Sequence, residues 1–165
     1  MANLIEDVAA LCAKRATLEA LTQSFSTLLR KRVSHYHWVG IYMVEGGELV
    51  LKGWDGEQAT EHVRIPIGEG ICGLAAREDR TVVVDDVSKD PRYLQCFLKT
   101  KSEIVVPIRH GRTVIGEIDI DCEKLAPWND ADRAFLEWCA DRLGVALGAE
   151  RKTIRKAATR SVRRD

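Results

Sequence analysis

The sequence lacks an excess of charge of either sign. Its 25 lysine and arginine residues balance 25 aspartate and glutamate residues among 165, so no global field would draw the protein to nucleic acid or to a membrane surface. It also lacks an apolar run long enough to cross a bilayer, and its first residues do not have the layout of a signal peptide. We therefore expect a globular chain with no nucleic-acid and no membrane partner.

Cysteine is present, but not in a pattern that builds a disulfide framework or a zinc site. The five cysteines are odd in number, and no two of them form a Cys-x-x-Cys pair. This pattern favours a reducing cytoplasm, and we predict neither a bound metal nor a cofactor. Free thiols there are either small core residues or reactive groups. The five are Cys12, Cys72, Cys96, Cys122 and Cys139, of which Cys12 and Cys139 lie in helical patterns and are expected to be core residues.

A glycine-rich turn at residues 68–73 lacks the Gly-Lys-Ser/Thr ending of a phosphate-binding loop and the full dinucleotide fingerprint. The turn leads into a short helix, and Cys72 lies near the start of that helix. A helix N-terminus generally lowers the pKa of a thiol. Cys72 is therefore a candidate reactive cysteine.

Hydrophobic periodicity predicts one helix at each end of the chain. Apolar residues recur at three- and four-residue steps over residues 1–33 and again over 129–148, where Asn129 forms an N-cap signal. Short β-branched and aromatic runs between them indicate strands. We predict a single α+β domain over residues 1–150, with a mostly antiparallel sheet and both terminal helices packed on one face. The basic tail, residues 151–165, is short and has no aromatic residue to stack on bases, so we expect it to be frayed.

The central hairpin carries an unusual row of acids. Glu117, Asp119 and Asp121 alternate with isoleucines along one strand, and Glu103 begins the strand before it. Side chains alternate between the faces of a strand, so the three acids share one face. They repel one another unless a cation or a shared proton lies between them. The simpler interpretation is a solvated face with ordinary acids.

Two further segments could contribute to a site. Trp38, Gly40 and Tyr42 share one face of a predicted strand, and Gly40 would leave a gap there for a ligand. The alternative is that both aromatic residues pack under a helix. Residues 85–101 form a long loop that contains Cys96, and loops of this length in compact domains are often functional.

Several short motifs appear together in this chain. They are WVGIY at 38–42, VRIP at 63–66, GEGICG at 68–73, SEIVVP at 102–107 and IDID at 118–121. With these motifs, residues from about 38 to the end of the last helix resemble the GAF-domain family of free methionine-(R)-sulfoxide reductases. The combination of Cys72, Cys96, Glu103, Asp119 and Asp121 is more specific than any single motif.

The resemblance implies roles for individual residues. Cys96 would be the nucleophile, and Trp38 and Tyr42 would form an aromatic wall for the thiomethyl end of the substrate. Glu103, Asp119 and Asp121 would hold the sulfoxide and amino groups, with Glu103 or Asp121 as a candidate general acid. The catalytic set implied is thus Cys96, Cys72, Glu103 and Asp121.

The implied chemistry also names partners. A thiolate attacks the sulfoxide sulfur, the cysteine becomes a sulfenic acid, and a second thiol condenses with it to a disulfide. Thioredoxin or a similar dithiol would then reduce that disulfide. The long terminal helices could form the contact face of a homodimer.

One position departs from the family pattern. The family usually has a resolving cysteine directly before the VRIP segment, and this chain has His62 there. Either Cys72 or Cys122 could take over that role. If neither thiol reaches Cys96, the protein could instead be a non-catalytic GAF module that binds or senses a small molecule.

Overall fold

The computed structural model describes residues 2–161, and the side chains of residues 3–148 within that range. Residues 162–165 of the predicted basic tail lie outside the described residues. The elements in order are α1 (Ala2–Ala13), α2 (Leu18–Arg32), β1 (Trp38–Glu45), β2 (Glu48–Gly56), β3 (Arg64–Pro66), α3 (Gly70–Glu78), β4 (Val82–Val84), a 3-10 turn (Val87–Lys89), β5 (Ser102–His110), β6 (Thr113–Cys122) and α4 (Asp130–Ser161).

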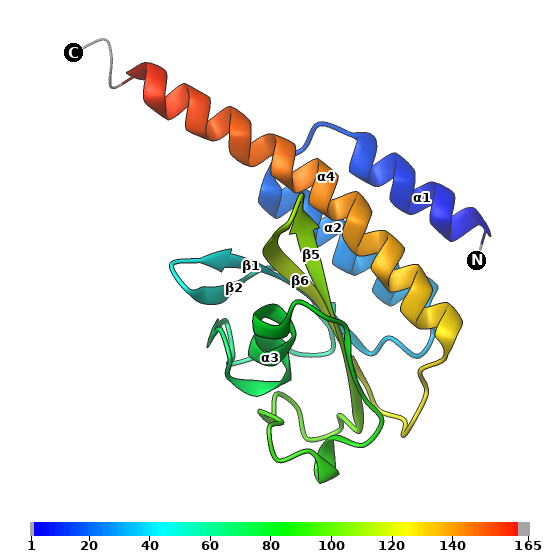
Figure 1. The fold of residues 1–165 in the computed structure, drawn as a ribbon. Coiled ribbons are helices and arrows are strands. Elements are labelled where there is room, and N and C mark those ends of the chain that lie inside the picture. The colour runs from blue at the N-terminus through cyan, green and yellow to red at the C-terminus, as the bar shows by residue number, and fades with distance from the viewer. Residues whose placement is uncertain (1, 162–165) are drawn as a thin grey trace.

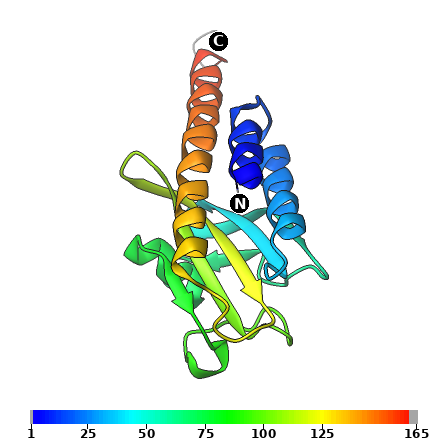
Figure 2. The same cartoon turned by 90° about the vertical axis from the view of Figure 1, so that its right-hand side faces the viewer.

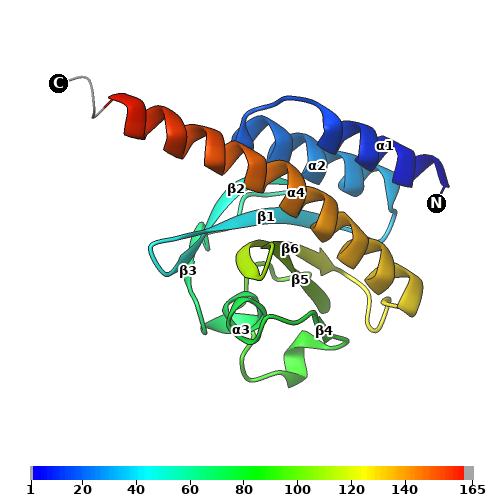
Figure 3. The ribbon, with the colours of Figure 1, turned by 45° about the horizontal axis from the view of Figure 1, so that its top comes forward.

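The strands form one six-stranded sheet in the order β3-β2-β1-β6-β5-β4, and its strand pairings are antiparallel. The hairpins β1–β2 and β5–β6 turn at Gly46-Gly47 and Gly111, which all take positive φ. Such backbone conformations cost glycine little, because it has no Cβ. The predicted α+β class with a mostly antiparallel sheet is confirmed (Figure 3).

The N-terminal region forms two helices, so the single helix predicted over residues 1–33 was wrong. α1 ends at Ala13, and α2 begins after Thr17, whose hydroxyl accepts a hydrogen bond from the backbone N–H of Ala20 at 3.2 Å. This N-cap bond satisfies a donor that a new helix start leaves without an intrahelical partner. The two helices lie side by side (Figure 1).

α4 is longer than the helix predicted over residues 129–148. It starts at the predicted cap, where the Asn129 side chain accepts hydrogen bonds from the N–H groups of Ala131 and Asp132 at 2.8 and 3.1 Å. It continues to Ser161, so residues 151–161 of the predicted frayed tail are helical, and its end extends beyond the sheet (Figure 1). An added Cβ at Gly144 would lie 1.9 Å from the carbonyl oxygen of Arg109, so this glycine lets α4 approach β5 closely.

The helices α1, α2 and α4 cover one face of the sheet, as predicted (Figure 2). The core between them contains alternate residues of the central strands, among them Ile118 and Ile120 of β6, together with Phe25 and Leu143 of the helices. Cys139 lies in this core, and Cys12 packs against it, as predicted for both. None of the helices within residues 2–161 is long and apolar enough to cross a membrane.

The opposite face of the sheet carries α3 and residues 85–101. A second core forms there from Trp38, Tyr42, Cys72 and Phe97 with aliphatic neighbours from β2, β3, β4 and α3. Glu103 of β5 and Glu117, Asp119 and Asp121 of β6 point to this face, because the isoleucines next to them in the chain point to the helices. The acids of the central hairpin therefore lie between the sheet and α3.

Candidate active site

Four acids form a cross-strand cluster on the α3 face of the sheet. In the register of β6 with its neighbours, Asp121 lies between Trp38 of β1 and Glu103 of β5, and Asp119 lies next to Gly40 of β1. Residues opposite one another in adjacent strands have Cβ atoms about 5 Å apart. We call Glu103, Glu117, Asp119 and Asp121 the acid cluster.

The acid cluster is buried, which excludes the simpler interpretation of a solvated face. The four residues are 5%, 0%, 2% and 3% exposed in chain order. Within residues 3–148, both carboxylate oxygens of Glu117 and one oxygen each of Asp119 and Asp121 lack a hydrogen-bond partner. Buried polar atoms are almost always hydrogen-bonded in folded proteins. This cluster is therefore built for something other than packing.

Burial makes these carboxyls hold their protons. It raises the pKa of Asp119 to about 7. Burial, followed by the charge of Asp119, raises the pKa values of Glu103, Glu117 and Asp121 well above their ordinary range. Removing charged groups from water disfavours the ionised form, and neighbouring carboxylates add repulsion. The cluster thus contains protonated carboxyls at neutral pH.

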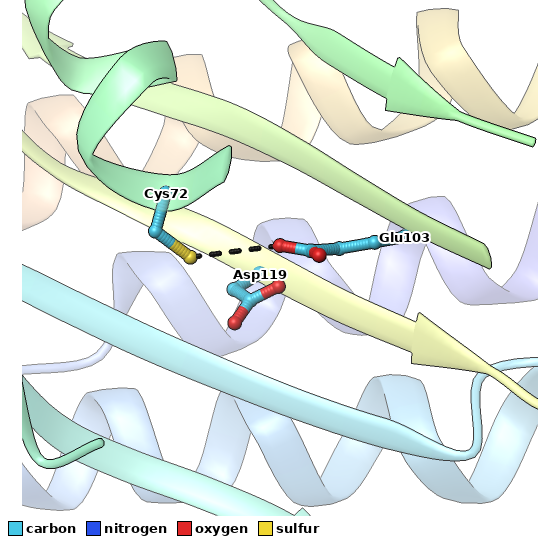
Figure 4. Close-up of side chains that lie close together, drawn as sticks. All are labelled: Cys72, Glu103 and Asp119. Carbon is cyan, nitrogen blue, oxygen red and sulfur yellow. Dashed lines mark hydrogen bonds between the residues drawn. The ribbon is translucent and has the colours of Figure 1, made fainter. Parts of the chain in front are cut away.

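Cys72 lies against the acid cluster and not in a solvent-facing helix terminus. Its thiol, from α3, donates a hydrogen bond to Oε1 of Glu103 on β5 at 3.7 Å (Figure 4). Asp119 of β6 points toward the same place (Figure 4). Burial first, and then the charges of Asp119, Glu117 and Glu103, raise the pKa of Cys72. The expectation that the helix start would lower this pKa was wrong, because burial among acids outweighs the helix dipole.

Cys96 lies on the same side of the sheet, in the segment between β4 and β5. It is half-buried, and its thiol donates to the carbonyl oxygen of Leu94 at 3.4 Å. Burial, followed by the charges of Asp119 and Asp121, raises the pKa of Cys96, and the nearby Thr60 hydroxyl lowers it. The Cys96 thiol is near enough to raise the pKa of Cys72 in turn.

The other cysteines are separated from this site by the sheet. Cys122 follows Asp121 on β6 and therefore points to the opposite face. Its Sγ accepts a hydrogen bond from the N–H of Lys124 at 3.4 Å. Cys12 and Cys139 belong to the helix layer. Among the five cysteines, all within the described residues, only Cys72 shares the α3 face with Cys96.

Trp38 and Tyr42 border the acid cluster on β1, but the gap predicted at Gly40 is filled. An added Cβ at Gly40 would lie 2.3 Å from two ring atoms of Trp38, so the indole covers this glycine. The Trp38 ring also contacts Phe97, with centroids 5.5 Å apart. A cavity of about 250 Å³ opens beside Trp38, Phe97 and Asp121 and gives solvent a route to one end of the cluster.

His62 lies beside the loop that carries Cys96. Its Nε2 is 3.4 Å from the carbonyl oxygen of Gln95, and its own carbonyl accepts a hydrogen bond from the Tyr42 hydroxyl at 2.9 Å. The N–H of His62 donates to the hydroxyl of Thr60 at 3.1 Å. The position that departs from the family pattern thus connects Tyr42 of β1 with the segment that carries Cys96.

The site contains residues to which sequence reasoning assigned no role. The alternation along β6 placed Glu117 on the face of Asp119 and Asp121, and its burial with two unpaired oxygens adds it to the site. Thr60 and Phe97 carry no comparable signal, since a threonine or phenylalanine in a loop is unremarkable until the chain folds. The sequence-predicted residues Trp38, Tyr42, Cys72, Cys96, Glu103, Asp119 and Asp121 come together on one face of the sheet.

Comparison with known proteins gives consistent matches. The GAF domain model matches residues 17–147. The free methionine-R-sulfoxide reductase of Escherichia coli K12 is 34% identical over 146 residues, which are 88% of this chain and 87% of that protein. The structure of the free methionine-R-sulfoxide reductase from Neisseria meningitidis with its substrate aligns with a TM-score of 0.84 and 32% identity, over 91% of this chain and 89% of that one. The reduced Staphylococcus aureus protein aligns with a TM-score of 0.82 and 36% identity, over 88% and 94% of the two chains.

Proposed function

The chain belongs to the GAF domain family and, within it, to the free methionine-R-sulfoxide reductases, and we propose that it reduces free methionine-(R)-sulfoxide through the thiol of Cys96. The observation that carries this proposal is that two thiols and four buried acids lie on one face of the sheet. A sulfoxide reductase needs a thiol within reach of the sulfoxide sulfur and a proton donor within reach of the oxygen bonded to it.

The acid cluster supplies both recognition and protons. The ammonium group of a free amino acid pairs with the carboxylates that are ionised, which offsets their repulsion. A carboxyl that keeps its proton, such as Glu103 or Asp121, donates it to the sulfoxide oxygen. The apolar thiomethyl end lies against Trp38 and Tyr42, whose faces also stabilise positive charge on the sulfur in the transition state.

The redox steps balance without a cofactor. The sulfur of Cys96 attacks the sulfoxide sulfur, and the oxygen passes to Cys96, so the substrate is reduced to a thioether and the cysteine is oxidised to a sulfenic acid. The sulfur of Cys72 then attacks the sulfur of the sulfenic acid and the S–S bond forms. The oxygen leaves as water, which contains the proton of the sulfenic acid and the proton of the Cys72 thiol. A dithiol such as thioredoxin reduces the disulfide by exchange.

Cys72 is the resolving thiol in this proposal, and His62 does not replace the missing cysteine. The support is positional, since Cys122 points to the helix face and Cys72 contacts Glu103 at 3.7 Å. His62 instead contacts Gln95, next to the nucleophile. Free cysteines and thioredoxin chemistry fit a reducing cytoplasm, which we propose as the location.

A homodimer completes the proposal for partners. Exposed apolar side chains occur on the helix layer, where Val145 of α4 is 70% and Ile5 of α1 is 40% exposed. Contact between two copies through these helices would remove that surface from water. Size-exclusion chromatography with light scattering measures this directly.

The test measures loss of methionine sulfoxide with thioredoxin, its reductase and NADPH, with the R and S epimers in separate reactions. We expect turnover of the R epimer only and poor turnover of methionine sulfoxide within a peptide, because a blocked amino group leaves buried acids unpaired. Cys96→Ser should lower turnover by at least 100-fold. Cys72→Ser should still complete one turnover and accumulate a sulfenic acid at Cys96, detected by trapping and peptide mass mapping. Cys12→Ser, in the helix layer, is the matched control and should behave as wild type.

Two outcomes would contradict the proposal. Substantial turnover by Cys96→Ser would show that another group attacks the sulfoxide. Binding of methionine sulfoxide without turnover of either epimer would favour the second candidate, a GAF module that binds a small molecule without changing it. That candidate is favoured by one observation, which is the presence of His62 where the family has a cysteine.

A further inference from the structure

The inner end of the acid cluster has the composition of a metal site. Sγ of Cys72 and one carboxylate oxygen each of Glu103 and Asp119 lie within 4.8 Å of one another, and all three residues are buried (Figure 4). The neighbouring Glu117 is 0% exposed, and neither of its carboxylate oxygens has a hydrogen-bond partner among residues 3–148. A set of buried donors with unpaired oxygens favours a cation at its centre.

We propose that the reduced protein binds one Zn²⁺ ion through Cys72, Glu103 and Asp119, with Glu117 as the fourth ligand. Zinc accepts thiolate sulfur and carboxylate oxygen together in tetrahedral sites. Calcium and magnesium prefer sets made of oxygen alone. The thiol at the centre of this set therefore selects zinc, or a metal of similar softness, over the hard cations.

The distances fit a tetrahedral site after a small adjustment. With Zn–S of about 2.3 Å and Zn–O of about 2.1 Å, neighbouring ligand atoms lie about 3.6 Å apart for sulfur and oxygen and about 3.4 Å apart for two oxygens. The thiol of Cys72 is already 3.7 Å from Oε1 of Glu103. All three ligand atoms lie within 4.8 Å of one another, so the set needs to contract by about 1 Å at most to reach these separations. The ligands come from α3, β5 and β6, so the site is held by three rigid elements.

The ion reaches this site along the acid cluster. The cavity of about 250 Å³ opens at Asp121, which lies two residues beyond Asp119 on the same face of β6. Two residues of a strand span about 6.7 Å, so Asp121 can pass a cation inward to the ligand set. The thiol proton of Cys72 and the protons of any neutral carboxyl in the ligand set leave to solvent as the bonds to zinc form.

Zinc at this position would bind the thiolate of Cys72 and would not contact Cys96. The metal would occupy the sulfur of Cys72 and the carboxylates that we assign to the substrate ammonium. Metal and substrate therefore exclude each other, and bound zinc stops the reaction before Cys96 is oxidised. The metal site goes beyond the proposed function, because binding of the ion requires neither substrate nor turnover.

The experiment titrates the reduced protein with Co²⁺, a spectroscopic substitute for Zn²⁺, in the absence of substrate and thiol reagents. We expect one equivalent of Co²⁺ to give a thiolate-to-metal charge-transfer band and the intense visible bands of a tetrahedral site, and one equivalent of Zn²⁺ to remove both. Cys72→Ser should lose the charge-transfer band. Asp119→Asn should keep the band at saturation with an affinity lower by about tenfold or more. Cys12→Ser, which removes a thiol from the helix layer, is the matched control and should bind Co²⁺ as wild type does.

The outcomes separate this proposal from the proposed function. Failure of Co²⁺ to produce the band, or a band that persists in Cys72→Ser, overturns the metal site whatever the turnover with sulfoxide. Loss of the band in Cys96→Ser with retention in Cys72→Ser also overturns it, because the metal would then lie at the other thiol. Exclusion of Co²⁺ by free methionine sulfoxide in Cys96→Ser, whose Cys72 the substrate does not draw into a disulfide, supports it, since the two would share carboxylates.

Discussion

Replacement of Glu117 by glutamine tests whether the carboxyl groups of the acid cluster are protonated in the folded protein. Glu117 is 0% exposed, and burial followed by the charge of Asp119 raises its pKa well above 4.5. The folded state therefore binds a proton that the unfolded chain releases above about pH 4.5. The contribution of the Glu117 carboxyl to the free energy of unfolding is fully present below about pH 4.5 and is lost as the pH rises toward the folded-state pKa.

The expected magnitude follows from proton linkage. One carboxyl that stays protonated in the folded state and ionises on unfolding lowers the free energy of unfolding by about 1.4 kcal/mol per pH unit. This loss applies over the pH range between about 4.5 and the raised folded-state pKa, and each pH unit of it is a sizeable share of the 5–15 kcal/mol typical of a domain. Glutamine has nearly the same shape and cannot ionise, so Glu117→Gln should gain stability relative to wild type as the pH rises through this range, by up to about 1.4 kcal/mol per pH unit.

Urea unfolding at pH 5.5, 6.5 and 7.5 measures this difference. Glu6→Gln, at an exposed position of α1, is the matched control and should differ from wild type by a constant amount. A difference between Glu117→Gln and wild type that stays constant across these pH values would refute the reasoning. It would mean that Glu117 is ionised in the folded protein, a state that a metal ion at the proposed site would favour.

Thr60→Val removes the hydroxyl that lowers the pKa of Cys96. Alkylation of Cys96 at neutral pH, followed by peptide mass mapping, should therefore be at least twofold slower in this variant, and Thr60→Ser should restore the rate. An unchanged rate in Thr60→Val would exclude a role for the hydroxyl. Leu143→Ala removes a fully buried side chain from the core between α4 and the sheet and should lower the free energy of unfolding by about 2–5 kcal/mol in urea. Asp141→Ala, at an exposed position of the same helix, should change it by less than about 0.5 kcal/mol; equal losses would contradict this orientation of α4.

Period-two alternation in the sequence predicted much of the site. The odd-numbered acids of β6 do share a face, and the same alternation, applied to Cys122, would have placed that thiol on the opposite face. The pKa of Cys72 could not be predicted from its helix position, because a helix terminus contributes about 0.3–1 kcal/mol, whereas burial of a charge costs several. The burial itself depends on β5 and β6, which are distant in sequence.

Other features depend on contacts that the sequence does not display. Thr17 is an ordinary polar residue within a helical pattern. Its hydrogen bond with Ala20 shows that a new helix starts there. Gly40 was predicted to leave a gap for a ligand, but the space is taken by the ring of Trp38 from the same strand. The cavity opens beyond this ring, at Asp121, where four separate segments meet.

The pairing of β5 with β6 couples correct folding to activity. The two strands contribute isoleucines to one face and the acid cluster to the other, and a slip of one residue in β6 would exchange the two sets. A slipped chain would have carboxylates in the helix core and isoleucines facing Cys72, so it could neither fold stably nor react. The turnover recovered after refolding would therefore be proportional to the fraction of molecules with the native strand register. A preparation with lower specific activity would contain inactive molecules mixed with fully active ones, and not a population of uniformly lower activity.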